Sequence, residues 1–199
     1  MEKRTLKQPK LLIRGCEMAP FYTGKGDTGD TGYLGEGRIS KNSLRIEAVG
    51  SVDEANAAIG FARSISIGQE TKDVLIEVQK QLYFLMTELS ASPDISDRFD
   101  KISDNEIQWL EEKISAIESL VDLKREFIIP GENPSSGALS LARTIVRRAE
   151  RKTIALFDAK KIQEEILISY LNRLSSLIFI LEVYEASLSG PGVRLVKGV

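Results

Sequence analysis

The chain has 199 residues, 42% of them hydrophobic, which is long enough to bury one core, and we expect one domain. Its 27 basic and 29 acidic residues give a net charge of -2, which excludes a general attraction to nucleic acid or to an anionic membrane. It contains no histidine, so triads, zinc hydrolases and phosphotransfer that depend on imidazole are excluded.

Cysteine content and the N-terminus indicate a cytoplasmic protein. The single cysteine, Cys16, excludes an internal disulfide and a multi-cysteine metal site, and it fits a reducing compartment. The first ten residues are charged and lack the apolar segment of a signal peptide. The apolar stretch from Leu177 to Leu181 is too short to cross a bilayer.

Residues 22–33, with the sequence YTGKGDTGDTGY, are the most distinctive segment. Glycines let the backbone approach a ligand closely, while threonine hydroxyls and the Lys25 ammonium can bind phosphate. The run has neither the Walker A nor the Rossmann spacing. From these residues alone, a phosphate-binding loop and a flexible polar loop both remain open.

Apolar residues recur at helical spacing in five later segments, which predicts an all-α five-helix bundle. The first four helices are expected at 51–64, 70–91, from Ser103 to about residue 121, and 134–157, and the fifth at 162–188. Strand-like alternation is weak throughout, so residues 1–50 are expected to form an extended arm or loop.

Start signals support three of these helices. Ser51-x-x-Glu54 and Ser103-x-x-Glu106 match the capping box, and Asn133 precedes a proline at the first position of the fourth helix. In the opening turn of a helix at 51, Glu54 faces the positive helix end, which explains it without a functional role. The neighbouring Asp53 could instead pair with an arginine of the fourth helix.

Two helices carry polar faces that could bind a ligand. On the fourth, guanidiniums gather on one face and can bind the oxygens of a polyphosphate, although a solvated charged face is also open. On the fifth, a polar stripe interrupts an apolar segment and indicates either a ligand site or a buried hydrogen-bond network between helices. The residues concerned are Arg143, Arg147, Glu150 and Arg151 with Arg148 beside them, and then Asn172, Ser175, Ser176 and Phe179.

Five segments occur in the same order as in one known family. They are the loop at 22–33, GSVDEANAAIG at 50–60, FIIPG at 127–131, ARTIVRRAER at 142–151 and YLNRLS at 170–175. With these segments in register, residues 21–186 resemble the PduO-type ATP:cob(I)alamin adenosyltransferases, also called corrinoid adenosyltransferases. The resemblance implies a helical bundle at 21–190, with an N-terminal extension at 1–20 and a C-terminal tail at 191–199.

The resemblance also implies an activity. The family transfers the 5'-deoxyadenosyl group of ATP to the cobalt of reduced cob(I)alamin and releases triphosphate. It implies a homotrimer with ATP and corrinoid at the subunit interfaces. Magnesium accompanies the ATP, and we do not assign its ligands. Two further partners are implied, a reductase and a cobalamin-dependent enzyme that receives the product. No nucleic acid or membrane partner is implied.

Site residues follow from the same resemblance, position by position. Asp53 and Arg143 match an intersubunit salt bridge, and Phe127 matches an aromatic that helps to displace the lower axial base of cobalamin. Arg147 and Phe127 are the expected catalytic residues. Those expected to bind ATP are Thr23, Gly24, Lys25, Gly26, Asp27, Gly29, Thr31, Gly32, Lys41, Arg147, Arg148, Glu150, Arg151 and Asn172.

One departure from the family pattern concerns the loop. The family usually has Thr-[Lys/Arg]-Thr-Gly-Asp, whereas this chain has Thr-Gly-Lys-Gly-Asp, which shifts the basic residue to Lys25 and removes a hydroxyl. That change favours a rival hypothesis, a non-catalytic protein that binds ATP or adenosylated corrinoid. A third hypothesis is a structural helical bundle with a charged surface and no affinity for ATP.

Overall fold

The computed structural model describes residues 22–92, 95–122, 126–190 and 192–196. The extension expected at 1–20, including Cys16, therefore lies outside the described residues. Five helices dominate the fold, as predicted: α1 (Leu44–Ile65), α2 (Gln69–Ser90), α3 (Asp104–Glu118), α4 (Pro134–Asp158) and α5 (Ile166–Ser187). The short 3-10 helix η1 (Ser96–Arg98) lies between α2 and α3.

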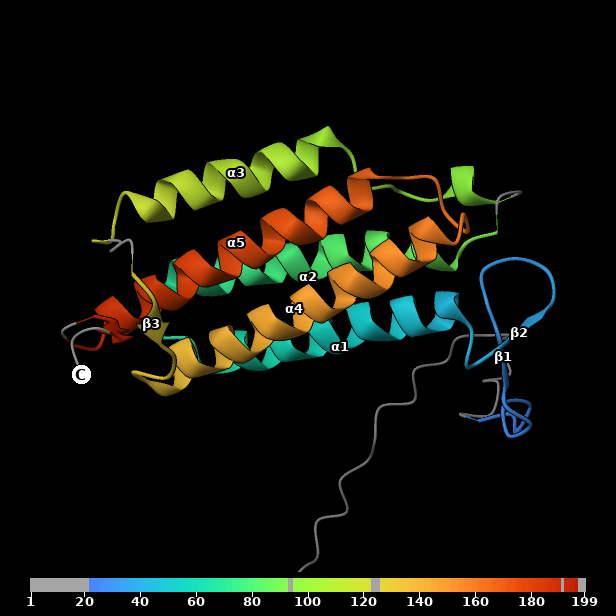
Figure 1. Cartoon of the computed structure of the whole chain (residues 1–199), viewed down its shortest axis with the longest axis horizontal. Coiled ribbons are helices and arrows are strands. Elements are labelled where there is room, and N and C mark those ends of the chain that lie inside the picture. Colours follow the sequence, from blue (N-terminus) through green and yellow to red (C-terminus); the bar gives the residue numbers. More distant parts are fainter. Residues whose placement is uncertain (1–21, 93–94, 123–125, 191, 197–199) are drawn as a thin grey trace, which may run out of the picture.

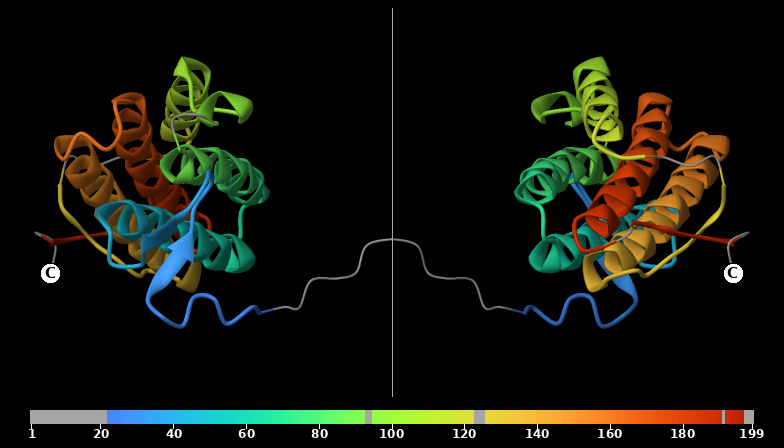
Figure 2. Two further views of the ribbon diagram at one scale, coloured as in Figure 1. Left: turned by 90° about the vertical axis from the view of Figure 1, so that its right-hand side faces the viewer. Right: turned by 90° about the vertical axis from the view of Figure 1, so that its left-hand side faces the viewer.

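The helices lie along one long axis, and successive helices run in opposite directions, so that α3 and α5 run parallel to each other (Figure 1). Helix α1 packs against α2 and α4, while α5 packs against α4 and α3. End-on views place α3 on the outside of the bundle, next to α5 (Figure 2). The core is therefore formed by four helices, with the fifth covering one side.

Four short strands, which the sequence did not predict, complete the described fold. β1 (Asp30–Gly32) pairs with β2 (Arg38–Ser40) as an antiparallel hairpin in which Thr31 faces Ile39. β3 (Ile128–Ile129) pairs with β4 (Arg194–Leu195) in the C-terminal tail. The hairpin and β3 lie near opposite ends of the bundle (Figure 1).

The expected start of the first helix was wrong. α1 begins at Leu44, and the Ser43 hydroxyl caps it by accepting a hydrogen bond from the Ile46 amide at 3.3 Å. The Ser51 hydroxyl instead donates to the Glu47 carbonyl at 2.8 Å, as a serine inside a helix does. Gly50 is tolerated within the helix because it is exposed and needs no packing partner.

The other start signals were more reliable. Capping boxes at Ser103 and Asn133 are both present, with Pro134 in the first turn of α4. Helix α5 begins at Ile166 rather than 162, because the preceding segment turns and is held by other contacts. Lys160 adopts a left-handed φ of 55° after α4, and Arg45 of α1 donates to the Lys161 carbonyl at 2.8 Å.

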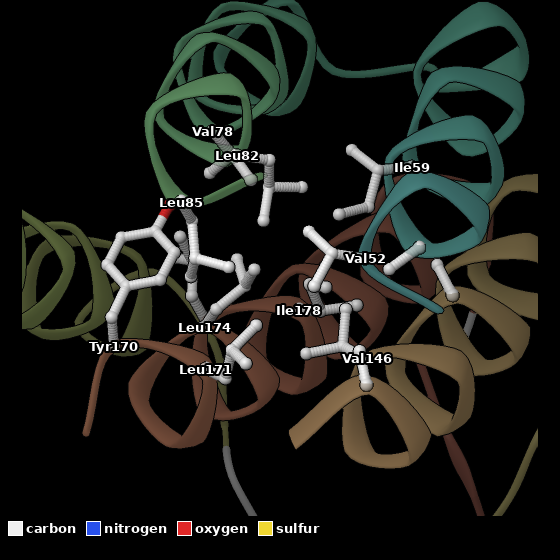
Figure 3. Close-up of a cluster of buried hydrophobic side chains, with 14 of the residues drawn as sticks. Val52, Ile59, Val78, Leu82, Leu85, Val146, Tyr170, Leu171, Leu174 and Ile178 are labelled. Atoms are coloured by element: carbon white, nitrogen blue, oxygen red, sulfur yellow. The ribbon is translucent and has the colours of Figure 1, made fainter. Parts of the chain in front are cut away.

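Branched side chains from α1, α2, α4 and α5 meet in the centre of the bundle (Figure 3). Tyr170 is fully buried there, and its hydroxyl donates to the Gln81 side chain at 2.9 Å, so its polar end is satisfied. Burial also raises the pKa of Tyr170, which keeps the phenol neutral. The residues labelled in the close-up are Val52, Ile59, Val78, Leu82, Leu85, Val146, Tyr170, Leu171, Leu174 and Ile178.

Among the described residues, α5 is the one helix whose length and composition would allow it to cross a membrane. Yet 61% of its apolar window is buried inside the bundle. Its hydropathy is therefore explained by contacts with α3 and α4 and by its place in the core.

Glu185, on α5, joins three separate segments through a fully buried carboxylate. It accepts hydrogen bonds from the amides of Ile67 and Gly68 at 2.8 and 2.9 Å, and from the Ser135 hydroxyl at 2.7 Å. These bonds satisfy the amides at the start of α2 and hold the first turn of α4. The carboxylate thereby fixes the end of the bundle at which β3 lies.

We predict that Glu185→Ala lowers the free energy of unfolding by about 3 kcal/mol or more, because it leaves two backbone amides without their charged acceptor. Urea unfolding followed by circular dichroism measures this. Glu112→Ala is the control: Glu112 is exposed on α3, and its loss is expected to change stability by less than about 0.5 kcal/mol. A loss below about 1 kcal/mol for Glu185→Ala would contradict the assigned role.

Candidate functional site

The glycine-rich run forms two consecutive tight turns before β1. The Asp27 amide donates to the Gly24 carbonyl at 3.1 Å, and the Gly29 amide donates to the Gly26 carbonyl at 3.3 Å. Gly24 and Gly29 have φ values of 67° and 90°, which side chains rarely allow. The glycines at these positions are therefore required by the path of the loop.

Two cations that follow the run hold it in shape. Arg38 of β2 donates to the carbonyls of Lys25 and Asp30 at 2.7 and 2.8 Å. The Lys41 ammonium donates to the Gly26 carbonyl at 2.8 Å. A β-carbon on Gly26 would lie 3.2 Å from that ammonium, so a side chain there would displace Lys41.

The loop is consequently structured, which argues against the flexible-loop interpretation. The structure brings the predicted residues from Thr23 to Gly32 together with Lys41. Thr23, Lys25 and Asp27 are exposed on it and free to meet a ligand. Arg38 was missed by the sequence analysis, since no motif distinguishes an arginine in a short strand.

The connection after β1 is anchored to α2. The Leu34 amide donates to the Ser90 carbonyl at 3.1 Å, and the Ser92 amide donates to the Leu34 carbonyl at 2.6 Å. A hollow lies between the hairpin, α1 and α2, and its lining includes Thr31, Gly32 and Asp53. Asp53 thus lies beside the loop and makes no ion pair within the described part of the chain.

A second hollow is a groove where α3, α4 and α5 meet. From here on, this surface is called the arginine groove, and its lining residues are Ile114, Glu118, Arg143, Arg147, Ser175, Ser176, Phe179 and Ile180. The guanidinium of Arg143 lies over the Phe179 ring, 5.8 Å from its centroid. Two cations on an open apolar wall suit an anionic ligand or partner.

The charged residues of α4 divide between two directions: Arg143 and Arg147 line the arginine groove, whereas Arg148, which the sequence places beside their face, pairs across to α1. Arg148 forms an ion pair with Glu54 of α1 and so turns away from the groove. Arg151 donates to the Arg147 carbonyl at 2.9 Å. The helix-dipole explanation of Glu54 was therefore wrong, because the residue lies in the interior of α1 and pairs across to α4.

The polar stripe of α5 also behaves differently from a buried network. The hydroxyls of Ser175 and Ser176 donate to the Asn172 carbonyl of their own helix, at 2.9 and 3.4 Å. The side-chain amide of Asn172 donates to the carboxylate of Glu150 on α4 at 3.1 Å, and this contact is exposed. Asn172 and Glu150 are therefore brought together, on a surface that a ligand can reach.

Phe127 lies apart from both surfaces. Its side chain is 86% exposed, an unusual state for a phenylalanine. Its carbonyl accepts a hydrogen bond from the Val196 amide at 2.9 Å, and β3 directly follows it. The segment is therefore fixed against the C-terminal tail, near the opposite end of the bundle from the loop (Figure 1).

These features define a helical-bundle protein with two surfaces that carry exposed cations, the loop and the arginine groove. The family model described as cobalamin adenosyltransferase matches residues 21–185. The chain belongs to the cobalamin adenosyltransferase family.

Curated relatives are similar over most of the chain. The corrinoid adenosyltransferase of Bacillus subtilis is 37% identical over 164 residues, which cover 80% of this chain and 82% of that protein. The corrinoid adenosyltransferase PduO of Salmonella typhimurium is 34% identical over 84% of this chain, which spans 50% of that protein.

Solved structures have the same fold. A variant of the PduO-type ATP:corrinoid adenosyltransferase from Lactobacillus reuteri, complexed with cobalamin and ATP, superposes with a TM-score of 0.81. It is 32% identical and covers 89% of this chain and 99% of its own. Another variant of that enzyme, complexed with ATP, has a TM-score of 0.78 at 33% identity, covering 87% of this chain and 98% of its own.

We predict that Arg38→Ala speeds amide hydrogen exchange across residues 24–30 by about tenfold, because two loop carbonyls lose their charged donor. Exchange followed by mass spectrometry measures this. Arg98→Ala, an exposed arginine in η1, is the control and should leave the loop unchanged. Equal exchange rates at residues 24–30 in the wild-type protein, Arg38→Ala and Arg98→Ala would show that Arg38 does not order the loop.

Proposed function

We propose that this protein is an ATP:cob(I)alamin adenosyltransferase, which transfers the 5'-deoxyadenosyl group of ATP to the cobalt of reduced cob(I)alamin. The observation that carries the proposal is the ordered loop held by Arg38 and Lys41, in a chain that belongs to the cobalamin adenosyltransferase family. A loop that is already ordered loses less entropy when it takes up a nucleotide than a flexible one does.

The proposed reaction is a displacement at C5' of ATP. The cobalt of cob(I)alamin supplies the electron pair for the new Co–C bond, and the C5'–O bond breaks as triphosphate leaves. Because cobalt is itself a strong nucleophile, the protein needs no general base, in accord with a chain that has no histidine. Its task is to align C5' with cobalt and to stabilise the leaving triphosphate.

The chain offers suitable groups for that task. We assign the phosphates to the loop from Thr23 to Gly32, to Lys41 and to Arg147, with Arg151 adding positive charge, whereas Arg148 is engaged by Glu54. Asn172 and Glu150 would bind the nucleotide through their exposed contact. Among the described residues no three acidic or cysteine side chains gather to hold a metal, which suits Mg²⁺ held mainly by phosphate oxygens and water.

Phe127 is assigned to the corrinoid. Its exposed ring can lie against the lower face of the corrin, where it would displace the axial base and exclude water. Without a lower ligand, cobalt becomes four-coordinate, and reduction of Co(II) to Co(I) becomes easier. An aromatic ring is suited to this place because it offers no lone pair that binds cobalt.

We further propose that the active site is shared between copies of the chain in a homotrimer. In one chain, loop residues line the hollow with α1 and α2, whereas Arg143 and Arg147 line the arginine groove. If the loop of one copy covers the groove of the next, both sets meet one ATP. Asp53, which lies beside the loop, would then reach Arg143 of the neighbouring copy.

The remaining assignments follow from these substrates. The active unit is residues 21–190. It acts in the cytoplasm, where ATP and a reductase for the corrinoid are available, and its product passes to a cobalamin-dependent enzyme.

The alternative, a non-catalytic ATP-binding or corrinoid-binding protein, is favoured by the shifted Lys25. Both hypotheses predict nucleotide binding, so only triphosphate release coupled to Co–C bond formation separates them.

We predict that purified protein converts chemically reduced cobalamin, with ATP and Mg²⁺, into a product with the light-sensitive spectrum of adenosylcobalamin. Lys41→Ala should lower kcat/KM for ATP by about 10- to 100-fold, the usual effect of losing a charged hydrogen-bond donor. Lys113→Ala, on α3, is the matched control and should retain activity. Absence of conversion while ATP binds would support the non-catalytic alternative.

We predict that Phe127→Ala slows adenosylation of cobalamin at least about tenfold but changes the reaction of cobinamide less than about twofold, each tenfold step being about 1.4 kcal/mol. Cobinamide lacks the lower base, so there is nothing for Phe127 to displace. Steady-state rates with the two corrinoids, compared in both proteins, provide the measurement. Equal losses with both corrinoids would refute the displacement role.

A further inference from the structure

Glu182, on α5, carries a buried carboxylate that the proposed chemistry does not use. The residue is 1% exposed, and neither oxygen has a hydrogen-bond partner among the described residues. A carboxylate is seldom buried without compensation, because loss of hydration disfavours its charge. The helix around it is strongly apolar, so its position calls for a specific partner.

Arg143 of α4 is that partner. Its Nε lies 3.7 Å from Oε2 of Glu182, and this nitrogen is also buried without a hydrogen bond. On its other side, the guanidinium lies over Phe179. Arg143 is thus held between a carboxylate and an aromatic ring at the edge of the arginine groove.

This geometry leaves one part of the guanidinium free. Within the described ranges, the two terminal nitrogens of Arg143 donate no hydrogen bond, and the side chain is 27% exposed. A guanidinium engaged through Nε can still offer a pair of N–H groups to a second acceptor. Arg143 therefore has one carboxylate partner, Glu182, and has N–H groups available for a second carboxylate.

The charge on Glu182 depends on the same contact. Burial raises the pKa of Glu182 above its ordinary value, while Ser140 and Arg143 favour the charged form and oppose the rise.

We propose that Glu182 is a positioning residue that holds Arg143 through Nε and directs its terminal nitrogens at a carboxylate entering the groove. The fitting carboxylate is Asp53 of a second copy, which makes no ion pair with the described residues of its own chain. The choice of Asp53 rests on the proposed function. The contact between Glu182 and Arg143 does not, so the two can be tested separately.

The contact itself is tested by NMR of arginine Nε–H groups in the full-length protein. The Arg143 signal, assigned by its loss in Arg143→Lys, should exchange slowly with water, and Glu182→Gln should speed that exchange at least about tenfold. Glu112→Gln, the same change on an exposed surface, should leave it unaltered. An unchanged signal in Glu182→Gln would overturn the proposal.

The role in the site is tested by a double-mutant cycle on kcat/KM for cob(I)alamin. Glu182→Gln should reduce it about tenfold in the wild-type background but less than about twofold in Arg143→Lys, because lysine has no Nε to be held. Equal losses in both backgrounds would overturn the proposal, since Glu182 would then act independently of Arg143.

If Glu182→Gln does not fold, the kcat/KM of Arg143→Lys alone still tests the proposal. Lysine preserves the charge but cannot serve two carboxylates in a fixed geometry, so kcat/KM should again fall about tenfold. Full activity in Arg143→Lys would overturn the proposal. Wild-type protein without adenosyltransferase activity would instead refute the proposed function, and the NMR result would still decide the contact.

Discussion

The close packing of α1 against α4 is the constraint on which the rest of the structure depends. Both helices bury alanines completely, among them Ala48 and Ala55 on α1 and Ala142 and Ala149 on α4. Small side chains let two helices approach closely, and the charged residues at the edges of the contact are then forced to pair. Glu54 meets Arg148 in this way, and Glu47 meets Lys152 at 2.9 Å.

This packing determines which cations of α4 remain for a ligand. Arg148 and Lys152 are engaged by α1, whereas Arg143 and Arg147 line the groove on the other side. The cations of the loop and hairpin also differ in what they contact. Arg38 binds two loop carbonyls, while Lys25 extends into solvent. Lys41 donates to one loop carbonyl, and its ammonium keeps further N–H groups for a phosphate.

Helical periodicity predicted the bundle and most helix boundaries, because amphipathic faces and capping residues are local signals. It failed at Ser43, where the cap lacks a glutamate three residues later, and the apparent capping box at Ser51 was taken as the start of the first helix. The fourth-helix arginines were recognised as a group with Arg148 beside their common face, but the ion pair of Arg148 with Glu54 could not be predicted because that partner is distant in sequence. Glu182 could have been noticed as an isolated acid in an apolar helix; its contact with Arg143 required the structure.

The central claim, that the loop of one copy completes the groove of another, is tested most directly by subunit complementation. Lys41→Ala damages the loop side and Arg147→Ala the groove side, and each homotrimer should be nearly inactive. After unfolding and refolding of an equal mixture, random assembly should restore about one quarter of the wild-type sites, since each site then draws one half from each of two chains. Activity no higher than the mean of the two separate variants would contradict the account, because the loop and the groove would then belong to one chain.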